Sequence, residues 1–178
     1  HKPTGSGKID ETMDIIMELC ETNEQVVVFS SQFNDPLYEI RDRVKNLGWT
    51  CEVIDGGAKD IDGVCENFRQ AKVNVICVNM KSGGEGLNLQ KSDRWPGGSA
   101  HAIFLDRWWN PSVNEQAEAR IYRKGANVPV TMHIMHCEDT VDAFIQAKLD
   151  MKTEMITGVM ESAALRKGDW KNQLEGLI

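Results

Sequence analysis

The residues best suited to chemistry in this chain are two arginines and a glutamine at the spacing of one helix face. The run Asn114-Glu-Gln-Ala-Glu-Ala-Arg-Ile-Tyr-Arg-Lys-Gly125 places Gln116, Arg120 and Arg123 at positions i, i+4 and i+7. Guanidinium groups on one face repel each other, and each binds phosphate through a planar fork of donors. The spacing therefore predicts an anionic ligand between them, best a polyphosphate. The alternative is a solvated basic face.

A second candidate site is the glycine-rich segment Lys81-Ser-Gly-Gly-Glu-Gly-Leu-Asn88. Its glycines permit a tight turn with exposed backbone N–H groups, which can cradle a phosphate. An ordinary glycine-rich turn has the same composition, so this segment by itself leaves both interpretations open.

Three other patterns suggest chemistry less strongly. Thr4-Gly-Ser-Gly-Lys8 lacks the first glycine of a Walker A loop, has Ile9 after its lysine and follows no expected strand. His133 and His136 would lie on opposite faces of a strand, so we expect ordinary strand histidines and no metal site. Trp108-Trp109 could stack on a nucleotide base or plug the end of the core, and we expect the plug for at least one of the two.

The composition is that of one globular α/β domain. The chain has 178 residues, of which 41% are hydrophobic and 26% charged. A net charge of -7 argues against an autonomous nucleic-acid clamp but allows local phosphate contacts from backbone N–H groups. Five cysteines without a C-x-x-C pair predict free thiols in a reducing compartment and no disulfide. We expect no membrane partner, since no apolar run reaches spanning length and no signal peptide is visible.

Segments typical of strands and of helices alternate along the chain. Short apolar runs predict buried strands at 25–30, 50–54, 73–78, 102–105 and 128–135. Amphipathic stretches predict helices at 8–23, 36–47, 59–70 and 139–160, and Asn110-Pro111 opens a further helix that carries the arginines. Residues 91–99 have the composition of a surface insertion. The alternation predicts an open, mostly parallel sheet with helices on both faces and functional loops at the carboxyl ends of its strands.

Five motifs in chain order resemble the second RecA-like lobe of superfamily-two helicases and translocases, nearest to the switch/sucrose-nonfermenting type. They are Val26-Val-Val-Phe-Ser-Ser-Gln-Phe33, Asp55-Gly56, Ser82-Gly-Gly-Glu-Gly-Leu-Asn-Leu89, Asp106-x-Trp-Trp-Asn-Pro111 and Gln116-Ala-x-x-Arg-x-x-Arg-x-Gly125. Each motif is weak alone, but five in order at sensible spacing form a specific pattern. The resemblance covers roughly residues 6 to 150. We expect one RecA-like lobe over residues 1–162, including the long helix at 139–160, followed by a tail at 163–178.

The resemblance also implies a role for each matching residue. Arg123 would be the principal arginine finger, with Arg120 as its partner, for ATP bound by a first lobe. The other residues implied at the nucleotide are Gln116, Gly86 and Asn88. The residues implied at the nucleic-acid backbone are Ser30, Ser31, Gln32, Lys81, Ser82, Gly83 and Gly84.

The chain departs from the family pattern at several positions. Asn79, Met80 and Lys81 stand where the family usually has Ser-Thr-Arg, which removes a threonine hydroxyl from a phosphate-contacting loop. Ile121-Tyr122 replaces the common Ala-His, and Ala126 replaces a glutamine. These departures indicate a divergent member from a bacterium or phage, which would be cytoplasmic, whereas a eukaryotic member would be nuclear.

The implied function is that of the second motor lobe of a DNA-dependent ATPase. Mg²⁺ and ATP would be held mainly by an N-terminal RecA-like lobe of the same polypeptide, and double-stranded DNA would cross both lobes. The 178 residues contain neither a Walker A loop nor an Asp-Glu box, so the isolated chain would be inactive. The alternative is a non-catalytic scaffold that docks a partner through the helix at 139–160, whose methionines suit an adaptable apolar contact.

Overall fold

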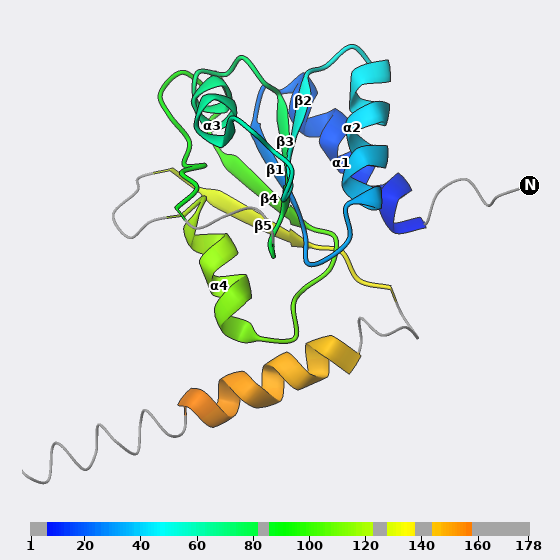
Figure 1. Ribbon diagram of the computed structural model, residues 1–178, viewed down its shortest axis with the longest axis vertical. Coiled ribbons are helices and arrows are strands. Elements are labelled where there is room, and N and C mark those ends of the chain that lie inside the picture. The colour runs from blue at the N-terminus through cyan, green and yellow to red at the C-terminus, as the bar shows by residue number, and fades with distance from the viewer. Residues whose placement is uncertain (1–6, 82–85, 123–127, 138–143, 158–178) are drawn as a thin grey trace, which may run out of the picture.

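The computed structural model describes residues 7–81, 86–122, 128–137 and 144–157 (Figure 1). The strands are β1 (Gln25–Ser30), β2 (Cys51–Ile54), β3 (Val75–Asn79), β4 (Ala100–Phe104) and β5 (Val130–Ile134). The helices are α1 (Gly7–Glu21), α2 (Asp35–Asn46), α3 (Ile61–Arg69) and α4 (Pro111–Ala119), and residues 144–157 form one more helix. All five strands and the first three helices begin and end within two residues of the sequence prediction.

The five strands form one parallel sheet in the order β2-β3-β1-β4-β5. Helices α1 and α2 lie on one face of this sheet, and α3 and α4 lie on the other (Figure 1). The apolar side chains of each pair pack against the sheet. The predicted open parallel sheet with helices on both faces is therefore confirmed. Every residue of β1 and β3 is buried, because these two strands have a neighbour on each side and a helix layer on each face.

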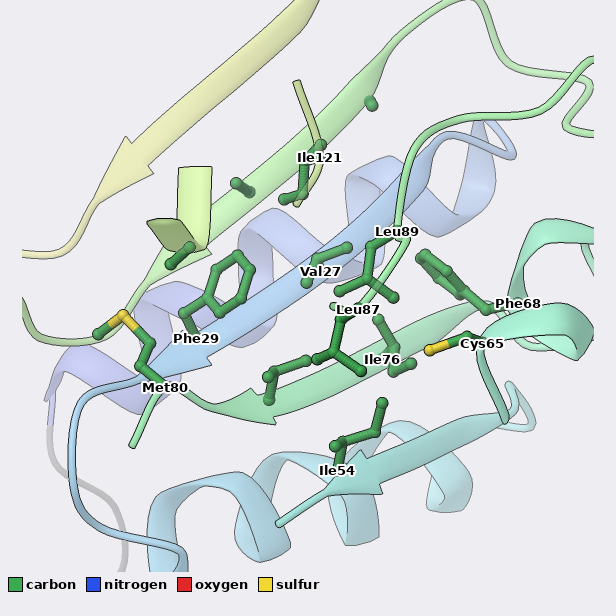
Figure 2. Packing of buried hydrophobic residues seen from close by; sticks show 14 of the residues in the cluster. Val27, Phe29, Ile54, Cys65, Phe68, Ile76, Met80, Leu87, Leu89 and Ile121 are labelled. Atoms are coloured by element: carbon green, nitrogen blue, oxygen red, sulfur yellow. The ribbon is translucent and has the colours of Figure 1, made fainter. Parts of the chain in front are cut away.

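The core that matters most for function lies between the sheet and α3 and α4. Phe29 and Phe104 stack across β1 and β4 with ring centroids 4.9 Å apart. Figure 2 shows Leu87 and Leu89 of the segment after β3 lying over this face of the sheet, close to Phe68 of α3. The chain after β3 therefore runs back across the sheet and fills the space between α3 and α4.

The prediction that 91–99 is only a surface insertion is wrong for Trp95. Its side chain is 5% exposed and packs edge-on against Phe68, with ring centroids 5.3 Å apart. The indole Nε1–H donates to the Phe68 carbonyl oxygen over 2.9 Å. Farther along, Gly97 N–H donates to the Asn23 carbonyl, and the Glu24 carboxylate accepts from the backbone N–H of Ser99. One indole and a few backbone contacts thus attach the insertion to the core.

We expect Trp95→Ala to lower the free energy of unfolding by about 3–5 kcal/mol, because it opens a cavity against Phe68. Trp109→Ala is the matched control, since Trp109 is 56% exposed and its ring has an exposed cation–π contact with Lys152. Its cost should stay below about 1 kcal/mol, the size of an exposed cation–π contact. Urea unfolding of both variants measures the difference, and similar losses for the two would show that Trp95 does not anchor the insertion.

The helix at 144–157 overlaps the predicted 139–160 helix, and the rest of that prediction lies outside the described residues. Leu149 is buried, and Ile145 lines a pocket beside the loop that follows β4. The apolar side chains that this helix leaves exposed are Phe144, Met151, Met155 and Ile156. Within the described residues, no helix has the length and apolar character needed to cross a membrane.

All five cysteines are free thiols, and four of them are buried. Burial, followed by the nearby Cys51, raises the pKa of Cys20 to about 12. The Sγ atoms of Cys51 and Cys77 lie 3.7 Å apart on neighbouring strands. Buried thiols with raised pKa values are poor nucleophiles, so Cys20, Cys65 and Cys77 behave as small apolar residues of the core.

His133 has a partner that its sequence pattern does not suggest. Its Nε2 lies 3.1 Å from Nδ1 of His101 on the neighbouring strand, with the rings stacked, while His136 lies beyond the end of β5. Burial lowers the pKa of both His101 and His133, and the nearby His133 lowers that of His101 further. Glu24 opposes this shift for His101. No three potential metal ligands cluster in the described part of the chain.

The two lowered pKa values predict that the fold loses stability in mild acid. Because each folded-state pKa lies below the unfolded one, the unfolded chain binds more protons as the pH falls through about 6.5. The stabilisation that depends on the two histidines being neutral is fully present above about pH 6.5. It is lost as the pH falls towards their folded-state pKa values. The difference in free energy of unfolding between wild type and the His101→Gln/His133→Gln variant should therefore change between pH 8 and pH 5.5. A constant difference would contradict the assignment.

Candidate nucleotide and nucleic-acid interface

The carboxyl ends of β1 and β3 bring two predicted nucleic-acid segments together. The Asn79 side-chain Nδ2 donates to the Gln32 carbonyl over 3.0 Å, and the Asn79 Oδ1 accepts from the Lys81 backbone N–H over 3.0 Å. Met80 N–H donates to the Ser30 carbonyl over 2.8 Å. Asn79 therefore connects the loop after β1 to the loop after β3, at a position where the chain departs from the family pattern.

The loop after β4 adds a carboxylate to this edge that sequence reasoning did not assign to the site. Asp106 accepts from the Ser30 hydroxyl over 3.1 Å and from the Ser31 backbone N–H, which lies 3.1 Å from each carboxylate oxygen. The Ser31 hydroxyl also donates to it. Both serines are buried. A signal was present in the sequence, because Asp106 directly follows the apolar run at 102–105 and opens the motif Asp106-x-Trp-Trp-Asn-Pro111.

A pocket of about 330 Å³ opens beside these loops, between the ends of β1 and β4. This is the point where the strand order reverses direction, which is the usual ligand position in open α/β sheets. Its polar lining includes Lys8, Ser31 and Asp106, and its aromatic lining includes Trp108 and Trp109. The pocket therefore offers both charged and aromatic contacts to a ligand.

The two tryptophans differ in their surroundings. Trp109 is exposed, so it does not plug the core; the Lys152 ammonium lies 4.6 Å from its ring centroid and donates to its carbonyl over 2.9 Å. Trp108 is half-buried, and its backbone N–H and C=O both bond to the Asn114 side chain, at 2.9 and 2.8 Å. Asn114 thus fixes the loop after β4 to the first turns of α4.

The Asp55-Gly56 motif stabilises the turn after β2. The Asp55 carboxylate accepts from the Tyr38 hydroxyl and from the Gly57 backbone N–H, the latter over 2.9 Å. These bonds, with that from Tyr38 the largest cause, lower the pKa of Asp55. The motif therefore has a structural explanation in this lobe.

A second cluster lies where the parallel strands begin, at the opposite end of β1 from Ser30. We call this end of the sheet the amino edge and the end near Ser30 the carboxyl edge. The Leu89 backbone N–H donates to the Arg120 carbonyl over 3.0 Å, and the Leu89 carbonyl accepts from the side chain of Gln25, the first residue of β1. These bonds place the end of the glycine-rich segment beside the end of α4. Figure 2 shows Leu89 on the same face of the sheet as Ile121, which follows α4. Asn88 and Arg120, which are predicted to bind the nucleotide, therefore lie near each other in the fold. They lie away from the loops that are predicted to contact nucleic acid.

Arg120 caps the carboxyl end of α4 and is half-buried. Burial lowers the pKa of its guanidinium, opposed by the nearby Cys65. Gln116, one turn earlier, is exposed. The predicted helix carries Gln116 but ends at Ala119, so the prediction is wrong for Arg120. The backbone N–H groups of Arg120 and Ile121 each donate to the carbonyl three residues earlier, which tightens the chain there, and Ile121 is buried.

A polar pocket of about 360 Å³ lies between α3 and residues 86–88. Gly86 and Asn88 line it with Asp62, Glu66 and Arg69, among others. Gly86 has φ +92°, a conformation that favours glycine. Apart from its chain neighbours, no atom of the described residues lies within 4 Å of where its Cβ would be. The predicted residues Ser82, Gly83, Gly84 and Arg123 lie outside the described residues.

The comparisons with known proteins agree with this geometry. The family model of the helicase conserved C-terminal domain matches residues 7–125. This chain belongs to that family. It is 26% identical over 159 residues to the putative ATP-dependent helicase/translocase YwqA of Bacillus subtilis, covering 88% of the chain and 16% of that protein. It is 37% identical over 124 residues to the DNA repair protein RAD5 of Debaryomyces hansenii, covering 64% of the chain and 10% of that protein.

Solved structures place the chain within the family. The SWI2/SNF2 ATPase core of Sulfolobus solfataricus, solved with double-stranded DNA, superimposes with a TM-score of 0.65 at 28% identity, over 88% of this chain and 32% of that one. The C-terminal part of the Fun30 ATPase domain gives 0.69 at 22% identity, over 84% and 48% of the two chains. The chain is the C-terminal RecA-like lobe of a superfamily-two helicase of the switch/sucrose-nonfermenting type, as its motifs predicted, and it spans only a small part of its relatives' length.

We expect Asn114→Ala to lower the free energy of unfolding by about 1–3 kcal/mol, because the Trp108 N–H and C=O lose their side-chain partner. Asn114 has no exposed surface, so water cannot replace it without rearrangement. Asn46→Ala, at an exposed position on α2, is the control and should change stability by less than about 0.5 kcal/mol. Equal effects in urea unfolding would refute the role of Asn114 in holding the loop.

Proposed function

We propose that this chain is the second motor lobe of an ATP-dependent DNA translocase. It would close over Mg-ATP bound by an N-terminal lobe of the same polypeptide and would contact the backbone of duplex DNA. The observation that carries this proposal is that the residues matching the family motifs fall into two clusters, one at the amino edge and one at the carboxyl edge of the sheet. That division suits a lobe that has to touch a nucleotide and a nucleic acid at the same time.

The amino-edge cluster suits the nucleotide. Arg120 and Arg123 would stabilise charge on the terminal phosphate during transfer to water, with Arg123 as the principal finger. The pocket beside Asn88 contains the Asp62 and Glu66 carboxylates, which repel phosphate but accept bonds from hydroxyl groups. We therefore place the ribose at Asn88 and Gly86, with Gln116 orienting the phosphate end. When bound, Mg-ATP supplies the phosphoryl group, and this lobe supplies positive charge and orientation.

The carboxyl-edge cluster suits the DNA backbone. Lys81 and the loop of Ser30, Ser31 and Gln32 lie together there, and in the family pattern Ser82, Gly83 and Gly84 continue the same surface. The net charge of -7 makes strong binding by this lobe alone improbable on electrostatic grounds, so the first lobe would supply much of the affinity. Opening and closing of the two lobes would then move the motor along the duplex without strand separation.

The test is DNA-stimulated ATP hydrolysis by the full-length protein. We expect Arg123→Ala to lower the stimulated rate by about 10³-fold or more, the range for an arginine finger, and Arg120→Ala to lower it less. Arg41→Ala is the control, because Arg41 lies on α2 on the other face of the sheet and pairs with Asp42. Retention of stimulated hydrolysis in Arg123→Ala would remove the finger assignment. Absence of hydrolysis in folded wild type would remove the motor function.

One observation favours a second function, that of a non-catalytic scaffold. The helix at 144–157 leaves Phe144, Met151, Met155 and Ile156 exposed, and flexible methionines suit a protein contact. The two proposals differ in what the full-length protein contains. A Walker A loop and an Asp-Glu box upstream of this lobe would support the motor, and their absence would support the scaffold.

A further inference from the structure

The donors of the loop after β1 are already occupied by an anion that belongs to the chain. The Ser31 backbone N–H lies 3.1 Å from both oxygens of Asp106, and the Ser30 and Ser31 hydroxyls donate to the same carboxylate. A backbone N–H and two hydroxyls converging on paired oxygens also suit a phosphate group. A DNA phosphate cannot take the Ser31 N–H while Asp106 holds it.

Asp106 is connected to α4, the helix whose carboxyl end is capped by Arg120. The next residue, Arg107, pairs with Glu118 near the end of α4, with Nη2 to Oε1 at 2.7 Å. Trp108 is bonded on both backbone sides to Asn114, which has no exposed surface. Residues 106–108 therefore contact α4 at both its first turns and its last turn. A displacement of Asp106 would therefore move α4 as a whole, because the Arg107–Glu118 and Trp108–Asn114 contacts are short and at least partly buried.

From these contacts we propose that Asp106 is an internal competitor of a DNA backbone phosphate and a positioning residue for α4. Without DNA, its carboxylate holds the loop of Ser30 and Ser31 and keeps the 106–109 segment in place. When a backbone phosphate enters the loop, Asp106 is displaced, and the Arg107–Glu118 and Trp108–Asn114 contacts transmit the change to α4 and Arg120. The inference rests on the proposed DNA contact of this loop. It adds that residues 106–108 transmit the presence of DNA from this loop to the residues at the amino edge.

The first test is duplex DNA binding by the 178-residue chain, measured by fluorescence anisotropy at fixed salt. Asp106→Asn keeps the side-chain shape but removes the competing charge, so we expect it to tighten binding by about five-fold or more, the lower end of ordinary coupling between sites. Asp93→Asn is the matched control: Asp93 is exposed, and both variants change the net charge equally. The proposal would be overturned if Asp106→Asn bound duplex DNA no more tightly than Asp93→Asn, or did not bind it at all.

The second test follows the transmission by hydrogen exchange. Adding duplex to wild type should speed amide exchange in residues 106–109 and in α4, and Asp106→Asn should show the faster exchange without DNA. A purely structural role would instead weaken DNA binding together with stability. Glu118→Gln, at a partly exposed position, removes the ion pair between Arg107 and the last turn of α4. In this variant, duplex DNA should still speed amide exchange at 106–109 but should have a smaller effect at the end of α4. Unchanged exchange in wild type on saturation with DNA would overturn the transmission.

Neither test involves ATP hydrolysis, so their failure is distinct from failure of the motor function. A protein that hydrolyses ATP with DNA stimulation, but whose Asp106→Asn variant binds duplex no more tightly than Asp93→Asn, retains the proposed function and loses this inference. A protein without stimulated hydrolysis whose Asp106→Asn variant binds duplex more tightly than the control loses the motor function and retains the competition at the loop.

Discussion

The pairing of β1 with β3 on one side and β4 on the other is the constraint on which the functional surfaces depend. Every residue of β1 is buried, so its register with both neighbours is fixed by packing on two faces. That register sets Ser30 beside Asn79 and brings the chain beyond Phe29 next to the chain beyond Phe104. The hydrogen bonds of Asn79 and Asp106 to the loop after β1 follow from this alignment. Without it, the segments would have no shared surface.

The same sheet also explains why the candidate nucleotide residues lie apart from the nucleic-acid loops. After β3 the chain crosses back over the sheet, and Leu87 and Leu89 are buried between α3 and α4. α4 runs in the opposite direction to β4, so its end reaches the same amino edge as Leu89. A single glycine-rich segment can therefore begin at one edge and end at the other. This path gives a physical connection between two sites that a motor lobe has to coordinate.

Charge is arranged in the lobe so that its acidic balance does not prevent phosphate contacts. Three negative groups near the functional loops have partners: Asp106 accepts from Ser31, Glu118 pairs with Arg107, and Glu66 pairs with Arg69. Exposed pairs such as Arg69–Glu66 contribute little to stability, but they reduce the negative field around each site. Arg120 is half-buried, where its charge acts through a lower dielectric than at the surface. The local fields at the two edges therefore differ from what the net charge alone suggests.

The sequence by itself determined the fold class, the strands and the family, because apolar runs such as Val26–Phe29 and the ordered motifs are local properties of the chain. It also predicted a helix that opens at Asn110-Pro111 and carries Gln116, which the structure has as α4. Tertiary structure decided what local patterns cannot encode. Trp95 enters the core because Phe68 offers it a partner, α4 stops at Ala119 because Ile121 is buried, and His101 meets His133 across two strands. The bond between Asp106 and Ser31 joins residues 75 positions apart, so only the folded sheet could reveal it.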